Sequence, residues 1–190
     1  MARYGKEHKE ATRQRIVEAA GRRLKQDGID GSGVATLMAD AGLTNGAFYA
    51  HFESKDDLVA TVVADQLRTQ AAKYGTLAPG LAGLEEFVRQ YLTPEHRDNP
   101  ATGCPSAALL DEIGRRTAAT KRAYTDGAWT IVDGIAAHLA PGDPKSAHGK
   151  ALGLFTMVVG SLQLSRALAD PELSDQVLEQ GIRNALAFMR

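Results

Sequence analysis

The stretch Val34–Leu58, V-A-T-L-M-A-D-A-G-L-T-N-G-A-F-Y-A-H-F-E-S-K-D-D-L, predicts two short helices joined by a glycine turn and followed by the start of a third helix. Gly42 stands where the first helix must end and the chain reverse, and that position favours the left-handed conformation that glycine adopts without strain. Thr44 is placed to cap the second short helix with its hydroxyl. Ser54 and Asp57 form the capping-box pattern that begins the third helix. The stretch therefore predicts a small helix–turn–helix unit.

The second short helix, expected over residues 45–52, presents two different faces. Phe48 and Phe52 are one helical turn apart and share the face that points into the core. Tyr49 and His51 are rotated off that face and can reach a DNA backbone. The first turn contains only small residues, so the free N–H groups at the helix start can approach phosphates and base edges closely. A plain helical hairpin with a solvent-exposed tyrosine and histidine is the alternative interpretation.

The charge distribution is uneven along the 190 residues. Residues 1–25 carry eight Lys or Arg against three Glu, whereas the rest of the chain carries 14 basic and 20 acidic residues. A basic head on an acidic body would concentrate attraction for phosphate at one end, although a charged, solvated first helix gives the same pattern. No apolar run approaches the ~20 residues that a membrane span needs, and no secretion signal is evident. We therefore expect a cytoplasmic protein without membrane contact.

The hydrophobic periodicity is helical throughout, which predicts an all-α fold of about nine helices. Glycine and proline breaks separate the periodic segments, and the region from Thr93 to Gly103 reads as a polar loop. The chain is long enough for one large domain or two small ones that share a core. Helices are expected over residues 9–26, 34–41, 45–52, 55–74, 81–92, from 105 onward, 120–139, 146–169 and 174–189.

Residues 12–20, T-R-Q-R-I-V-E-A-A, and residues 41–58 resemble the N-terminal DNA-binding domain of the TetR/AcrR-type transcriptional regulators. The pattern G-x-F-Y-x-H-F-x-S-K from Gly46 to Lys55 is highly specific for that family. The resemblance implies a three-helix DNA-binding domain over residues 1–54 and an all-α effector-binding and dimerisation domain over residues 55–190. It also implies a homodimeric, ligand-responsive repressor that a small-molecule effector releases from double-stranded operator DNA.

The resemblance assigns DNA contacts by position. It places phosphate contacts at Ser32, Thr44, Tyr49, His51 and Lys55, and base contacts at Asn45 and Ala47, with Gly46 between them. Two positions depart from the family pattern. Gly33 stands where a second Ser or Thr is common, which puts one backbone contact in doubt, and Leu24 replaces a frequent Phe and reads as a packing variant.

The C-terminal half carries apolar stripes that fit either a dimer seam or the core of a single chain. The residues predicted for the seam are Leu152, Phe155, Val159, Leu162, Val177, Leu178, Ile182 and Leu186. An effector pocket would be walled by aromatic and Met side chains, although such residues at helical spacing also form ordinary cores. The candidate wall residues are Phe87, Tyr91, Leu109, Tyr124, Trp129, Phe155 and Met157.

Cys104 is the only cysteine, so the chain forms no internal disulfide and no multi-cysteine metal cage. It stands at a helix start, a position that favours the reactive thiolate, and a thiol-based redox or electrophile sensor is therefore one alternative. Packing as a small buried hydrophobe is the other reading of Cys104. A helical interaction module that no longer binds DNA is a further alternative for the whole chain. No catalytic constellation, metal-ligand spacing or phosphate-binding glycine loop is evident, so we expect neither an enzyme nor a cofactor.

Overall fold

The computed structural model describes residues 2–190, with side chains from Glu7 onward, so the side chains of Arg3 and Lys6 in the basic head lie outside the described residues. The described chain contains helices and turns and no β-strand, and none of its helices combines the length and apolarity required to cross a membrane. The helices are α1 (Ala2–Asp27), α2 (Val34–Asp40), η1 (Asn45–Ala50), α3 (Lys55–Tyr74), α4 (Leu81–Tyr91), α5 (Pro94–Asp98), η2 (Pro100–Thr102), α6 (Pro105–Gly114), α7 (Ala118–Leu139), η3 (Pro144–Ala147), α8 (His148–Ala167) and α9 (Pro171–Met189), where η marks a 3₁₀ helix. The predicted all-α fold class is confirmed.

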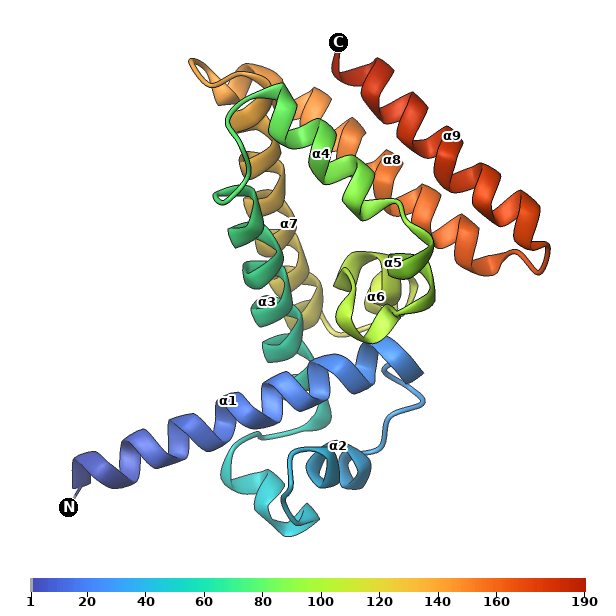
Figure 1. Ribbon diagram of the computed structural model, residues 1–190. Helices are drawn as coiled ribbons and strands as arrows, with labels where there is room; N and C mark the ends of the chain where they lie inside the picture. Colours follow the sequence, from blue (N-terminus) through green and yellow to red (C-terminus); the bar gives the residue numbers. More distant parts are fainter. Residues whose placement is uncertain (1) are drawn as a thin grey trace.

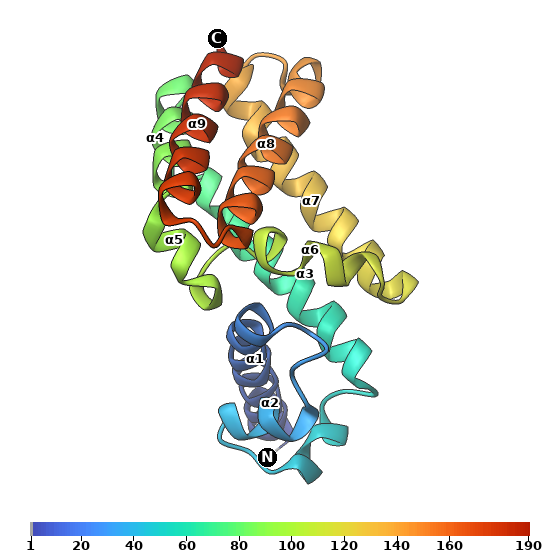
Figure 2. The same ribbon diagram turned by 90° about the vertical axis from the view of Figure 1, so that its right-hand side faces the viewer.

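The helices form two groups connected by α3 (Figure 1). α1, α2 and η1 lie together at the N-terminal end, and α3 leads from them into the larger group. There α3 lies against α7, α8 and α9 run side by side, and α4 contacts α7 and α9 (Figure 2). One hydrophobic core runs through both groups. The prediction of a domain boundary after residue 54 stays a prediction, because α3 contributes to both groups.

α1 begins at Ala2 rather than near the expected Lys9. The first turns carry no apolar stripe in the sequence, so hydrophobic periodicity gave no signal for a helix there. Ile16, Ala20 and Leu24 form the apolar stripe of α1 and are fully buried, with each side chain 0% exposed. Gly28 follows the end of the helix with a φ of 79°, a conformation that glycine adopts without strain.

The second short helix differs from its prediction. Residues Asn45–Ala50 form a 3₁₀ helix that ends before the expected residue 52. The Ala47 N–H donates to the Thr44 carbonyl oxygen at 3.0 Å, which is the tight i to i+3 bond of this helix type. The Thr44 side chain makes no cap hydrogen bond, so the predicted hydroxyl cap is wrong and the hydroxyl is left free for another partner.

The next helix start is confirmed as a capping box. The Asp57 N–H donates to Ser54 Oγ at 3.1 Å, and Asp57 Oδ2 accepts from the Glu53 N–H at 3.1 Å. Gly42 adopts a φ of 68° at the turn before η1, also as predicted. These local signals fix the entry and exit angles of η1, because each one satisfies or redirects backbone groups within a few residues.

Two glycines of α7 permit its close approach to α3. A Cβ added at Gly127 would lie 2.5 Å from Leu67 Cβ, and one added at Gly134 would lie 3.1 Å from Tyr74 Cβ. Side chains of ordinary size at these positions would force the helices apart. The crossing therefore depends on glycine at both points of α7, and it holds α3 along its C-terminal half.

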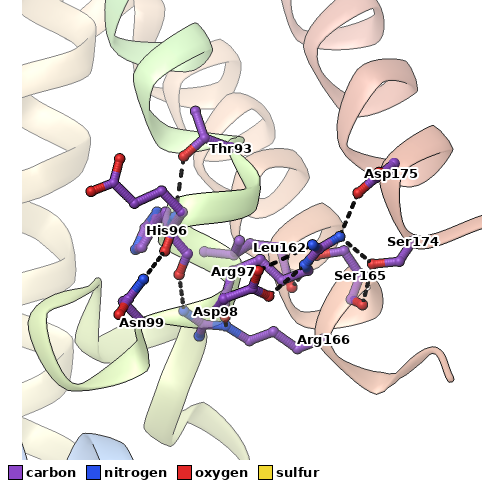
Figure 3. Close-up of polar contacts among 11 residues, drawn as sticks. Thr93, His96, Arg97, Asp98, Asn99, Leu162, Ser165, Arg166, Ser174 and Asp175 are labelled. Atoms are coloured by element: carbon purple, nitrogen blue, oxygen red, sulfur yellow. Dashed lines mark hydrogen bonds and ion pairs between the residues drawn. The ribbon is translucent and has the colours of Figure 1, made fainter. Parts of the chain in front are cut away.

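Residues Thr93 to Gly103, expected as a polar loop, contain α5 and η2. Thr93 caps α5 by accepting the His96 N–H at 3.1 Å, and Pro94 occupies the favoured first helical position. The prediction missed α5 because its five residues are too few to show an apolar period. Figure 3 shows that α5 is held by side chains from α8 and α9.

The two helix groups are joined through α6 and α1. Glu112 on α6 accepts the backbone N–H groups of Ile29 and Asp30 at 3.0 and 2.9 Å, and Arg116 forms an ion pair with Asp30. Lys25 of α1 donates to the Gly103 carbonyl oxygen at 2.9 Å. The loop between α1 and α2 is therefore anchored by residues of the C-terminal group.

Candidate nucleic-acid interface and a neighbouring cavity

The turn before η1 and the first residues of η1 form an exposed surface of small and polar residues. Thr44, Asn45 and Gly46 are exposed, Ala47 is half-buried, and 76% of Tyr49 is exposed. Beneath them Phe48 and Phe52 are 1% and 2% exposed, with their ring centroids 5.8 Å apart. The two phenylalanines therefore anchor η1 to the core, as predicted, and leave its polar side facing solvent. An exposed side of this kind can lie against a DNA groove.

Basic residues of α1 lie beside this surface. The Arg13 guanidinium stands 4.7 Å from the centre of the Phe52 ring and donates to Thr61 Oγ1 at 3.2 Å. His51 is half-buried, and its pKa lies below the usual value because of burial and the nearby charges of Lys9 and Arg13. These effects favour the neutral form of His51, and Lys9 and Arg13 carry positive charge beside it.

Two residues predicted to contact phosphate have partners within the chain. Ser32 is 1% exposed, and its hydroxyl donates to the Gly28 carbonyl oxygen at 2.7 Å. Lys55 donates to the Ile29 carbonyl oxygen at 2.6 Å. Both bonds hold the loop between α1 and α2. The phosphate contacts of Ser32 and Lys55 stay predictions. The Ser32 hydroxyl would have to leave its carbonyl partner to donate to a phosphate, whereas the Lys55 ammonium has further N–H donors to offer one.

A cavity of about 520 Å³ lies in the C-terminal group between α3, α4 and the α5–η2 segment. Its polar and charged lining includes Gln70 and Lys73 from α3 and His96 from α5. Of the predicted pocket residues, Phe87 and Tyr91 line this cavity. The others lie elsewhere: Leu109 and Phe155 are buried in the core, Met157 is half-buried against it, Tyr124 donates to Ser106 Oγ at 3.0 Å, and Trp129 is 51% exposed.

His96 is held in one neutral form at the wall of this cavity. Its Nε2 accepts the Cys104 N–H at 3.0 Å and therefore carries no proton, while Nδ1 donates to the Tyr91 carbonyl oxygen at 2.7 Å. Burial lowers the pKa of His96, and the nearby charges of Arg166, Lys73 and Lys25 lower it further. Cys104 also lines the cavity and is 2% exposed. The imidazole of His96 thus connects two junctions, the one between α4 and α5 and the one between η2 and α6.

The α5–η2 segment is anchored to α8 and α9 (Figure 3). Arg166 of α8 donates to the backbone carbonyl oxygens of His96, Arg97 and Ala107 at 2.7, 3.0 and 3.1 Å. Arg97 in turn donates to Asp175 at 2.6 Å on α9. Because Lys25 reaches Gly103 from the other side, this wall of the cavity contacts both α1 and the last two helices of the chain.

The polar lining of the cavity was not predicted from the sequence. Gln70 is 6% exposed at a position where the α3 stripe would otherwise be apolar, and that interruption is a signal the sequence does contain. Lys25 and His96 carry no such signal. Their partners lie on other segments of the chain, which a local pattern does not reveal.

The residues predicted for the dimer seam divide into two sets. Leu152 is 50% exposed, and Val177 and Ile182 are half-buried. The remaining five are buried within the chain: Phe155, Val159, Leu162, Leu178 and Leu186. On α8 the exposed positions Leu152, Thr156, Gly160 and Leu164 fall four residues apart and form one stripe.

Comparison with known proteins gives the same interpretation of the N-terminal region. Residues 16–62 match the family model described as bacterial regulatory proteins, tetR family. The chain is 37% identical over 62 residues to the HTH-type transcriptional regulator AcrR of Shigella flexneri, a match that covers 33% of this chain and 29% of AcrR. It is 25% identical over 171 residues to an HTH-type transcriptional repressor of Mycobacterium tuberculosis, which covers 75% of this chain and 90% of the repressor.

The fold as a whole has solved counterparts. The reduced form of Escherichia coli NemR superposes with a TM-score of 0.78 at 17% identity, covering 92% of this chain and 95% of NemR. A second regulator, described as a TetR/AcrR family member, superposes with a TM-score of 0.74 at 17% identity. The superposition covers 95% of this chain and 100% of that regulator's chain. The fold and the N-terminal surface define a helix-turn-helix protein. More particularly, its N-terminal region is that of a TetR/AcrR-type regulator.

Proposed function

We propose that the chain is a DNA-binding transcriptional repressor that works as a homodimer and leaves its operator when a small molecule binds. The observation that carries this proposal is the exposed face of η1, where Thr44 has a free hydroxyl and Tyr49 is 76% exposed. The proposed DNA contacts are Ser32, Thr44, Asn45, Gly46, Ala47, Tyr49, His51 and Lys55. An interaction module without DNA binding would have no use for this exposed set beside the cations of α1.

A second copy of the chain is the proposed partner for α8 and α9. The α8 stripe of Leu152, Thr156, Gly160 and Leu164 is exposed in the single chain, and the small residues at its centre permit close helix approach. Two helices from each chain would then form a four-helix seam. A two-fold axis would present two η1 surfaces to successive major grooves, which requires a separation of about 34–36 Å.

Effector release is proposed to act through α3 and the α5–η2 segment. α3 begins at the capping box beside η1 and ends at the cavity, where Gln70 and Lys73 form part of the lining. A ligand that moves the end of α3, residues 69–74, would change the orientation of the N-terminal helices. Affinity for the operator would fall because both half-sites must be engaged together.

A thiol-based sensor acting through Cys104 is the second candidate. Cys104 lines the cavity, and the chain resembles NemR, which was solved in a reduced form. The 2% exposure of Cys104 weighs toward a packing role. Treatment with a mild thiol-reactive electrophile would separate the two: loss of DNA binding in the wild type but not in Cys104→Ser would support the sensor.

The DNA-binding proposal is tested by fluorescence anisotropy with DNA from upstream of the chain's own gene, across a salt series. Specific binding should weaken with salt, because neutralising phosphates releases counterions. Asn45→Asp places a negative charge at the proposed interface and should weaken binding more than about tenfold, since like charges placed face to face repel. Asn184→Asp makes the same change at an exposed position of α9 and should leave the affinity for DNA unchanged. Equal effects of the two variants would contradict the proposed interface.

A further inference from the structure

Tyr91 lines the cavity and carries a buried hydroxyl group without a nitrogen or oxygen hydrogen-bond partner. Tyr91 is 5% exposed, and the Cys104 thiol is the polar group that interacts with its phenolic oxygen. Burial raises the pKa of Tyr91 well above its usual value, with the Cys104 thiol adding to the effect, so the group stays a neutral O–H donor. A buried polar group left unpaired costs free energy. A ligand oxygen that accepts this hydrogen bond would remove that cost.

The surroundings of the cavity carry an excess of positive charge. Lys73 lines the cavity, and Lys25 and Arg166 lie close enough for all three to depress the pKa of His96, after the larger effect of burial. Lys25 is 7% exposed and bonds to a backbone carbonyl, and Arg166 bonds to three. Within the described chain, none of these three cations forms an ion pair with a carboxylate. Glu95, exposed at the rim, is the one acidic residue in the lining.

The rest of the wall is aromatic and apolar. Phe87 and Leu77 line the cavity beside Tyr91, and the Phe87 and Tyr91 ring centroids are 5.5 Å apart. Tyr74 packs behind them, 4.9 Å from the Phe87 ring. The two ring pairs are tilted by 41° and 46°, and an aromatic wall of this kind favours a flat ring packed against it. His96 offers no charge to a ligand, since both of its ring nitrogens are already bonded within the chain.

We propose that this cavity binds an aromatic carboxylate, with its carboxylate near Lys73 Nζ and the Tyr91 hydroxyl and its ring against Phe87 and Leu77. The cavity offers one lining cation and one unpaired hydroxyl donor. This set suits a carboxylate, with its single negative charge, better than a phosphate group. The proposal names the class of effector, and its regulatory meaning rests on the proposed function. The binding itself is measured without DNA, so failure of the DNA-binding proposal would leave this result unaffected.

The test uses 2-naphthoate and its neutral isostere 2-naphthamide, titrated into the full chain by isothermal calorimetry at pH 7. Lys73→Met removes the lining charge at similar side-chain length, and Tyr91→Phe removes only the unpaired hydroxyl. Arg89→Met is the matched control, because Arg89 is an exposed cation on α4 that does not line the cavity. Thermal unfolding of each variant without ligand reports whether the fold is intact.

We expect 2-naphthoate to bind the wild type roughly tenfold more tightly than 2-naphthamide, because hydrogen bonds to charged groups contribute more than neutral ones. Lys73→Met and Tyr91→Phe should each remove most of that preference, while Arg89→Met keeps it. Tyr91→Phe should change the thermal stability of the free protein little, since the hydroxyl has no nitrogen or oxygen partner there. Equal affinity for the two compounds, absence of naphthoate binding at millimolar concentration, or an unchanged preference in both cavity variants would overturn the proposal.

Discussion

Replacing Glu112 with glutamine is expected to loosen the joint between the N-terminal helices and the rest of the chain. Each carboxylate oxygen of Glu112 accepts one backbone N–H, from Ile29 at 3.0 Å and from Asp30 at 2.9 Å. The glutamine amide keeps one acceptor but turns an NH₂ group toward the other N–H. The Glu112 side chain is 19% exposed, so water replaces the lost bond only in part.

The magnitude follows from the bond that is lost. A hydrogen bond to a charged group contributes about 1.5–3 kcal/mol, and partial exposure favours the lower half of that range. We therefore expect the free energy of unfolding to fall by about 2 kcal/mol. With a urea m-value of about 2–3 kcal/mol/M, the unfolding midpoint should fall by roughly 0.7–1 M.

The assay is urea unfolding followed by circular dichroism, at one protein concentration because association would otherwise alter the apparent stability. The control is Glu179→Gln, whose carboxylate is 68% exposed and 3.6 Å from Arg183. An exposed pair of this kind contributes about 0–1 kcal/mol, so its midpoint should hardly move. If Glu112→Gln unfolds at the same urea concentration as the control, the joint does not depend on these two hydrogen bonds.

Three further outcomes are expected. Gly42→Ala should destabilise the chain by about 1 kcal/mol, because the φ of Gly42 is 68°. Gly46→Ala should not destabilise it, because the φ of Gly46 is not positive. Thermal unfolding compares the two variants, and equal shifts in melting temperature would refute backbone strain as the cause. The pKa of His96 is lower in the folded chain than its usual 6.5. The contribution of neutral His96 to stability is therefore full above pH 6.5 and is lost as the pH falls toward the pKa of the folded state. The difference between the urea unfolding midpoints at about pH 7.5 and about pH 5.5 should be smaller in His96→Gln than in the wild type. Leu164→Glu places a charge on the exposed stripe of α8 and should shift the chain from dimer to monomer in sedimentation, while an unchanged dimer would place the seam elsewhere.

Features set by a few neighbouring residues were predictable from the sequence. Gly42 and Ser54 act on backbone groups within a turn of themselves, and Phe48 and Phe52 share a face by their spacing alone. The exposed side of η1 follows from that spacing, because burying the phenylalanines turns the rest of the helix outward. The family resemblance covered this same region.

Features that depend on distant partners were not predictable. Lys55 bonds to the Ile29 carbonyl oxygen across 26 positions, so its residue type alone gave no sign of that bond. Trp129 looked like a pocket wall by its aromatic character, yet the placement of α7 leaves it 51% exposed. The cavity itself arises where three separate segments meet, which no single window of sequence contains.

The bonds of Arg166 bear on how this protein could diverge over evolution. All three of its acceptors are main-chain oxygens, at His96, Arg97 and Ala107, so the side chains at those positions can be exchanged without removing an acceptor. Substitutions that reshape the wall of the cavity therefore need not detach it from α8. A chain that keeps the arginine can therefore change these side chains, whereas loss of the arginine would leave three buried or partly buried carbonyls to find new donors.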